Sequence, residues 1–250
     1  MNAAITQHPS IGRATAIRTR DRRIGVAVAV FVPLVVFIGF ARSYFLKGLF
    51  GFPPLPSLLV HAHAVTMTLW VGLFTGQVWL VASHRTRLHM KLGISGAVLA
   101  LVVFILGILA TLAAAARGSA IPGWEPLRFL VVPLGDMMAF GTLVGTGLYF
   151  RRRMDTHKRL MLLSALGLLP AAVARIPLDF IQSNGAFAYY GIPDLCIVAL
   201  VVYDTIKQRR LHPAYFWGAS LLILSHPLRI MLSNTDLWVR IAEPLVALMK

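Results

Sequence analysis

Long apolar runs recur along this chain, and they constrain its possible folds more than any other feature. Hydrophobic residues occupy 58% of the 250 positions and charged residues 13%, and the mean hydropathy is +0.75. Soluble domains are about half apolar and about one quarter charged. The hydrocarbon core of a bilayer is about 30 Å thick, so a crossing helix needs roughly 20 apolar residues. The sequence therefore predicts an all-α, polytopic membrane protein.

The apolar runs divide the chain into a bundle of about seven predicted transmembrane helices. We expect these helices at about residues 24–40, 57–83, 92–115, 129–150, 160–177, 191–206 and 214–232. Residues 1–23 are predicted to be a basic cytoplasmic tail with a disordered start, and residues 24–250 a single transmembrane domain. The first run is long and no clear cleavage site follows it, which favours a signal-anchor over a signal peptide. Residues 235–250 are expected to form an interfacial helix.

The distribution of positive charge predicts the orientation of the bundle. The formal net charge is +15, and the basic residues gather in the N-terminal tail and in three loops around residues 85–91, 151–159 and 207–210. Cytoplasmic loops are enriched in Lys and Arg, so the N-terminus is predicted inside and the C-terminus outside. This topology signal accounts for the charge, and we expect no nucleic-acid partner. Anionic lipids at the cytoplasmic face are the expected partners of these loops.

Two histidines open the second predicted helix, where ionisable groups are costly and mark function by default. At intervals of three and four residues, His63 is followed along its face by Thr66, Trp70, Gln77 and His84. This stripe predicts a face turned toward the bundle interior. His61 lies on another face, above Gly72 and Gly76, whose spacing is typical of close helix packing.

Further ionisable residues fall at a similar depth in other predicted helices. Asp136 lies in the fourth, Asp194 in the sixth, and His226 and Arg229 in the seventh, all in the outer half. Imidazole suits transition metals, and two imidazoles from different helices can hold a haem iron. The sequence therefore favours a redox-active protein, a membrane oxidoreductase, that binds haem b or a transition metal ion.

In this hypothesis His63 and His226 are the best ligands, and His61 is a further cofactor-binding candidate. Asp136 and Asp194 are the candidate catalytic residues, with Asp136 also able to carry protons. Arg229 is expected to pair with the charge of a bound anionic group. A quinone or a lipid is the expected class of substrate.

Other hypotheses fit the same residues. In an intramembrane zinc hydrolase acting on a lipid, Asp136 or Asp194 would serve as ligand or base. In a non-catalytic transporter or assembly factor, Asp136 and the histidines would relay protons or bind substrate. Structural ion pairs between Arg175 and Asp179, or Arg229 and Asp194, are an alternative. Near the inner face, His89 and His157 are either interfacial residues or ligands of a second haem.

Several segments resemble a family of uncharacterised bacterial polytopic membrane proteins, which implies a place in the bacterial inner membrane. They are His-Ala-His at 61–63, Asp-Thr-His-Lys-Arg-Leu-Met at 155–161, Tyr-Asp at 203–204 and Ser-His-Pro-Leu-Arg at 225–229. The two levels of histidines also resemble the membrane cytochromes b561, although helix count and spacing differ. A histidine in both the second and seventh helices resembles the membrane zinc hydrolases of the ceramidase and progestin-receptor type. Those carry another histidine four residues from the one in the seventh helix, where this chain has Leu222 and Ile230.

Overall fold

The computed structural model of the chain describes residues 10–121 and 123–249. The protein is 81% helical, and the described residues contain no strand. In chain order the elements are α1 (Ser10–Phe40), the π-helix η1 (Ala41–Phe45), α2 (Leu58–Ala82), α3 (Thr86–Ala116), α4 (Pro126–Phe129), α5 (Val131–Tyr149), α6 (Met154–Leu166), α7 (Leu169–Val173), α8 (Asp179–Gln208), α9 (Pro213–Ser233) and α10 (Asp236–Ala247). The predicted all-α fold class is confirmed.

Within the described residues, five helical segments are long and apolar enough to cross a bilayer. They are Arg23–Phe45, α2, α3, Pro126–Tyr149 and α8. The fifth and seventh predicted helices correspond to α6 with α7 and to α9. The first of these is divided at residues 167–168 into two short helices, and α9 carries polar and charged side chains in its second half. A count of about seven spans thus remains a prediction.

Several helix boundaries differ from those predicted. Helix α1 already begins at Ser10, inside the predicted tail, while the expected disordered start at residues 1–9 lies outside the described residues. Residues 179–190, predicted as a loop, form the first part of α8. Within this part, Gly185 has a φ of 50° and a ψ of −131°, which are not helical, so α8 is kinked there. A positive φ of this kind suits glycine because it has no Cβ.

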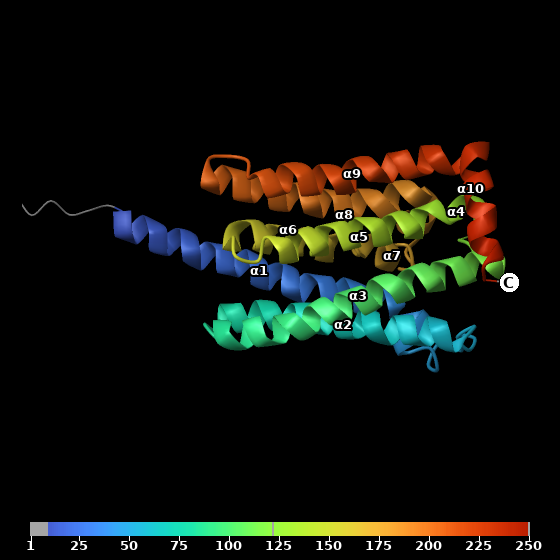
Figure 1. Ribbon diagram of the computed structural model, residues 1–250, viewed down its shortest axis with the longest axis horizontal. Helices are drawn as coiled ribbons and strands as arrows, with labels where there is room; N and C mark the ends of the chain where they lie inside the picture. The colour runs from blue at the N-terminus through green and yellow to red at the C-terminus, as the bar shows by residue number, and fades with distance from the viewer. Residues whose placement is uncertain (1–9, 122, 250) are drawn as a thin grey trace, which may run out of the picture.

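The long helices run side by side along the long axis of the molecule (Figure 1). Helices α2 and α3 pack together on one side and α8 and α9 on the other, while α1, α5 and α6 lie between them. Helix α10 lies across one end of the bundle and packs against α3, α4 and α9. There the indole Nε1 of Trp238 donates a hydrogen bond of 2.8 Å to the carbonyl oxygen of Leu127. The helix predicted within residues 235–250 is therefore present.

The three basic loops lie at the same end of the bundle (Figure 1). They are the connections from α2 to α3, from α5 to α6 and from α8 to α9. We call this the basic end, and the end covered by α4 and α10 the opposite end. The alternation of basic and non-basic loops along the sequence thus matches their separation in space. The side of the membrane that each end faces remains a prediction.

The glycines that allow close helix packing are not those expected. A Cβ atom on Gly72 or Gly76 would have no neighbour within 4 Å, so the packing predicted for this pair is wrong. Instead, Gly39 of α1 lies directly against the backbone carbonyl of Ala172 in α7. Glycine spacing identifies a smooth helix face, but the rotation of the helix decides whether that face meets a neighbour.

We expect the substitution Gly39→Ala to destabilise the protein, because its Cβ would lie only 2.7 Å from the carbonyl carbon of Ala172. Overpacking of this kind typically costs about 1–3 kcal/mol. The matched control, Gly72→Ala, adds a methyl group in open space and improves helix propensity by about 0.5–1 kcal/mol. Thermal unfolding in detergent, followed by tryptophan fluorescence, should give a lower Tm for Gly39→Ala and an unchanged or higher Tm for the control. Equal Tm values would contradict the close crossing of α1 and α7.

Candidate functional site

A buried ion pair joins α5 to α9 in the half of the bundle away from the basic end. The Arg229 guanidinium donates from Nη1 to the Asp136 carboxylate, and from Nη2 to the Ser225 hydroxyl at 2.8 Å. Gly135, next to Asp136, leaves room for this contact, because a Cβ there would lie 2.8 Å from Arg229 Cζ. The Gly-Asp sequence of α5 therefore supplies both the space and the opposite charge that a buried arginine needs.

A second polar pair joins α9 to α8. The His226 ring is 2% exposed, and its Nδ1 lies 3.1 Å from Asp194 Oδ2 in a hydrogen bond. The ring stacks on Tyr190, with 4.1 Å between centroids and an interplanar angle of 21°. The Nε2 atom of His226 and the hydroxyl of Tyr190 are buried and have no hydrogen-bond partner within the described part of the chain. Buried polar atoms are normally satisfied, so these two indicate a place where a ligand or a proton is received.

These two pairs form one cluster, because His226 and Arg229 are three residues apart on α9. We call it the polar cluster, and its members are Asp136, Tyr190, Asp194, Ser225, His226 and Arg229. It brings together four residues that the sequence singled out: Asp136, Asp194, His226 and Arg229. All four lie in the half of the bundle opposite the basic end, as their positions in the sequence predicted.

The partners within the cluster differ from the ion pairs that the sequence suggested. Arg229 pairs with Asp136 and not with Asp194. At about 100° per residue, positions three apart on a helix point about 60° apart, so Arg229 faces α5 while His226 faces α8. The suggested pair of Arg175 with Asp179 is also wrong, because Arg175 Nη1 donates instead to the carbonyl oxygen of Ala171 at 2.6 Å.

The histidines of α2 lie apart from the cluster. His63 is half-buried, and its Cε1 lies 3.5 Å from the position that a Cβ on Gly107 would take, beside the side chain of Met137. Since Met137 follows Asp136 on α5, His63 reaches the depth of the polar cluster but on another side of α5. Its Nδ1 is buried without a partner in the described part of the chain. His61 is exposed, with its ring 6.0 Å from that of Tyr44.

The separation of these histidines bears on a shared metal site. His63 and His226 belong to α2 and α9, which lie on opposite sides of the bundle (Figure 1). The described residues contain no group of three or more His, Cys, Asp or Glu side chains that could hold a metal ion. The geometry thus gives His226 a fixed orientation and a free nitrogen, without a set of further protein ligands around it.

The sequence did not identify a further buried ion pair near the basic end. Arg159 of α6 donates to Asp204 Oδ2 of α8 from Nε at 2.9 Å and from Nη2 at 2.7 Å. The two residues are 2% and 4% exposed. Arg159 was predicted to lie in a basic loop, but α6 begins at Met154 and carries it into the bundle. The sequence feature that could have indicated this pair is Asp204, a single acid near the end of an apolar helix, which needs a cationic partner when it is buried.

At the basic end, His89, His157 and His212 each lie at the start of a helix. The rings of His89 and His157 have centroids 6.3 Å apart, so the pair required by the second-haem hypothesis is close together. His157 Nδ1 is already hydrogen-bonded to the carbonyl oxygen of Gly147 at 2.7 Å. His212 caps α9, where its Nδ1 accepts from the backbone amide of Ala214 at 3.1 Å. His212 therefore has a structural role.

No protein-family model, curated protein or solved structure matches this chain. Its function is therefore inferred from the contacts among its own residues. The polar cluster is the best candidate, because it combines a fixed ion pair, a titratable pair and unpartnered polar atoms within one buried region.

Removing one partner of the buried ion pair should destabilise the protein strongly. We expect Asp136→Asn to cost about 3–5 kcal/mol, because it leaves the Arg229 cation buried without an anion. The double variant Asp136→Leu with Arg229→Met removes both charges and should recover most of this loss. The free energies of unfolding of the two variants and the wild type can be measured by unfolding in mixed micelles with increasing SDS.

The matched control is Asp236→Asn. Asp236 also pairs with an arginine, Arg128, but its side chain is 87% exposed, so the loss should be only about 0–1 kcal/mol. A loss in Asp136→Asn no greater than in this control would show that the buried pair does not stabilise the bundle.

Proposed function

We propose that this chain is a multi-pass protein of the bacterial inner membrane, with about seven spans and its basic end in the cytoplasm. Five apolar helices and the gathering of the basic loops at one end support this topology. Within it, the polar cluster relays protons as part of a non-catalytic carrier for a polar solute. Intramembrane chains of Asp and His are typical of proton relays in pumps and transporters.

The observation that carries this proposal is the state of the His226 ring. Its Nδ1 is hydrogen-bonded to Asp194, while its Nε2 is buried and has no hydrogen-bond partner within the described part of the chain. An imidazole in this arrangement accepts a proton at Nε2 and releases the proton of Nδ1 to the carboxylate, so that the ring returns to a neutral form. Histidine is suited to this role because its charge changes near neutral pH.

The prolines beside the relay connect proton transfer to movement of the helices. Pro193 precedes Asp194 within α8, and Pro227 follows His226 within α9. A proline inside a helix removes a backbone hydrogen bond and weakens the helix at that point. The Arg229–Asp136 pair holds α9 against α5, so a change of charge between His226 and Asp194 acts mainly on the contact between α8 and α9. This contact is the expected moving part of the carrier.

Proton flux into liposomes tests the relay. With the purified protein reconstituted around a trapped pH-sensitive dye, a potassium diffusion potential should drive proton uptake above that of protein-free liposomes. In Asp194→Asn the acceptor carboxylate is lost, and we expect uptake to fall about tenfold, in the range that a positioned acid or base contributes. His226→Gln should have the same effect.

Asp179→Asn is the control, since Asp179 is an exposed acid on the same helix and should leave uptake unchanged. Monodisperse gel filtration and an unchanged tryptophan spectrum establish that each variant is folded. Wild-type uptake equal to that of empty liposomes, or undiminished uptake in both cluster variants, would contradict the relay.

A second candidate function is binding of haem or a transition metal in a redox or hydrolytic protein. It is favoured by the same ring, because a metal-ligating histidine usually donates its other N–H to a carboxylate, as His226 does to Asp194. His63 Nδ1 is another nitrogen without a hydrogen-bond partner among the described residues, but α5 lies between His63 and His226. A zinc hydrolase normally has three protein ligands, and the described residues offer no such group.

An optical spectrum combined with elemental analysis separates the two functions. For the proton relay, we expect detergent-purified protein to show no Soret band and no stoichiometric iron, copper or zinc. A Soret band, or one metal ion per chain, that is lost in His226→Gln and kept in His61→Gln would overturn this expectation. Iron with a Soret band would then indicate the oxidoreductase, and zinc alone the hydrolase.

A further inference from the structure

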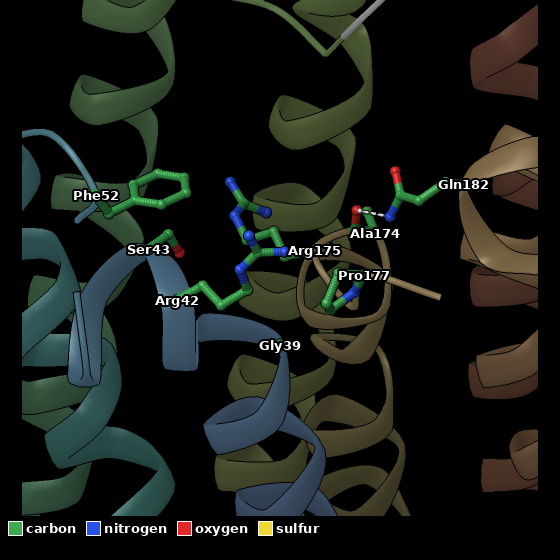
Figure 2. Close-up of a pocket in the computed structure, with 8 residues that line it drawn as sticks. All are labelled: Gly39, Arg42, Ser43, Phe52, Ala174, Arg175, Pro177 and Gln182. Atoms are coloured by element: carbon green, nitrogen blue, oxygen red, sulfur yellow. Dashed lines mark hydrogen bonds between the residues drawn. The ribbon is translucent and has the colours of Figure 1, made fainter. Parts of the chain in front are cut away.

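A pocket of about 400 Å³ lies at the opposite end of the bundle, between η1 and the connection from α7 to α8 (Figure 2). This volume is within the range of about 300–1,000 Å³ that is typical of small-molecule sites. Two arginines, Arg42 and Arg175, line it together with Ser43, and Phe52 and Pro177 contribute apolar walls. None of these residues belongs to the polar cluster.

The two arginines enter the pocket because of the close crossing of α1 and α7. Gly39 lies against Ala172, and each arginine follows its side of this contact by three residues. Three residues are nearly one helical turn, so Arg42 in η1 and Arg175 in the turn after α7 come to the same place. Figure 2 shows their side chains pointing toward one another across the pocket.

Neither guanidinium has a carboxylate partner among the described residues. Arg42 lies over the ring of Phe50 at 5.6 Å, and Arg175 over the ring of Phe40 at 4.7 Å. The only hydrogen bond of either side chain within the described part of the chain joins Arg175 to the Ala171 carbonyl. Two cations that share a pocket repel each other, and the repulsion is larger near apolar walls than in water. An anion placed between them would remove this cost.

The pocket also provides a neutral donor. The Ser43 hydroxyl is buried and has no hydrogen-bond partner within the described part of the chain, although buried hydroxyl groups normally have one. Two guanidinium groups and one hydroxyl form a donor set typical of phosphate or carboxylate recognition. The apolar walls next to them suit a ligand that carries hydrocarbon beside its charged group.

We infer that this pocket binds an anionic phosphate or carboxylate group through Arg42, Arg175 and Ser43. The pocket lies at the end of the apolar segment Arg23–Phe45, where a spanning helix reaches the lipid headgroups. The anion therefore comes either from a lipid headgroup or from a free small molecule. The inference does not depend on the proton relay, because it involves other residues and another pair of helices.

Ligand-induced stabilisation of the full chain tests the pocket and separates the two sources of the anion. The Tm in a neutral detergent is measured with inorganic phosphate, with phosphatidylglycerol in the micelles, and with diacylglycerol, which has no phosphate, as the uncharged reference. A rise with phosphate indicates a free anion, and a rise with phosphatidylglycerol alone indicates a lipid headgroup. No rise with either anion overturns the inference, as does an equal rise with diacylglycerol.

The variant Arg42→Gln identifies the site. Its apparent affinity for the stabilising anion should fall about tenfold, the loss expected when one charge-assisted contact is removed. Without the anion, its Tm should equal or exceed that of the wild type, because the repulsion between the arginines is relieved. This second measurement distinguishes loss of the site from failure to fold.

Arg117→Gln is the matched control, since Arg117 is an exposed arginine at the same end of the bundle. It should bind the anion as the wild type does. Equal loss of affinity in Arg117→Gln and Arg42→Gln would show nonspecific attraction to positive charge and would overturn the inference. A lower Tm of anion-free Arg42→Gln would also contradict it, because the arginines would then not repel each other.

Discussion

Ionisable side chains that lie between apolar helices must find a partner, and this requirement connects the helices of the bundle. An unpaired buried charge costs several kcal/mol, on the order of 3–5 when one partner of a pair is removed. Near the basic end, Arg159 and Asp204 join α6 to α8, and in the other half Arg229 and Asp136 join α9 to α5. Each pair links helices far apart in the sequence and so determines which of their faces point inward.

The spacing of three residues on α9 gives the polar cluster two distinct parts. Arg229 points to α5 and forms a fixed ion pair, whereas His226 points to α8 and forms a pair that can exchange a proton. The charges of the Arg229–Asp136 pair stay fixed, whereas those of the His226–Asp194 pair can change. Protonation can therefore alter the contact between α9 and α8 while the contact between α9 and α5 is kept. This division is the physical basis of the proposed relay.

The pocket at the opposite end departs from the pairing found elsewhere. Arg42 and Arg175 are brought together by the glycine contact between α1 and α7, yet the described part of the chain provides no acid beside them. The two buried ion pairs are complete within the protein, whereas Arg42 and Arg175 are exposed and contact only aromatic rings and one backbone carbonyl among the described residues. The protein thus has two candidate functional regions that depend on different helix contacts.

Composition along the chain determined the all-helical fold with its long apolar helices, the grouping of the basic loops and most members of the polar cluster, because hydrophobicity and insertion cost act segment by segment. Tertiary structure alone decided that Arg229 pairs with Asp136, that Arg159 reaches Asp204, and that Gly39 rather than Gly72 makes a close contact. These outcomes depend on where each helix begins, how it is rotated and which helix lies beside it. No single segment contains that information, since it arises only when all the helices pack together.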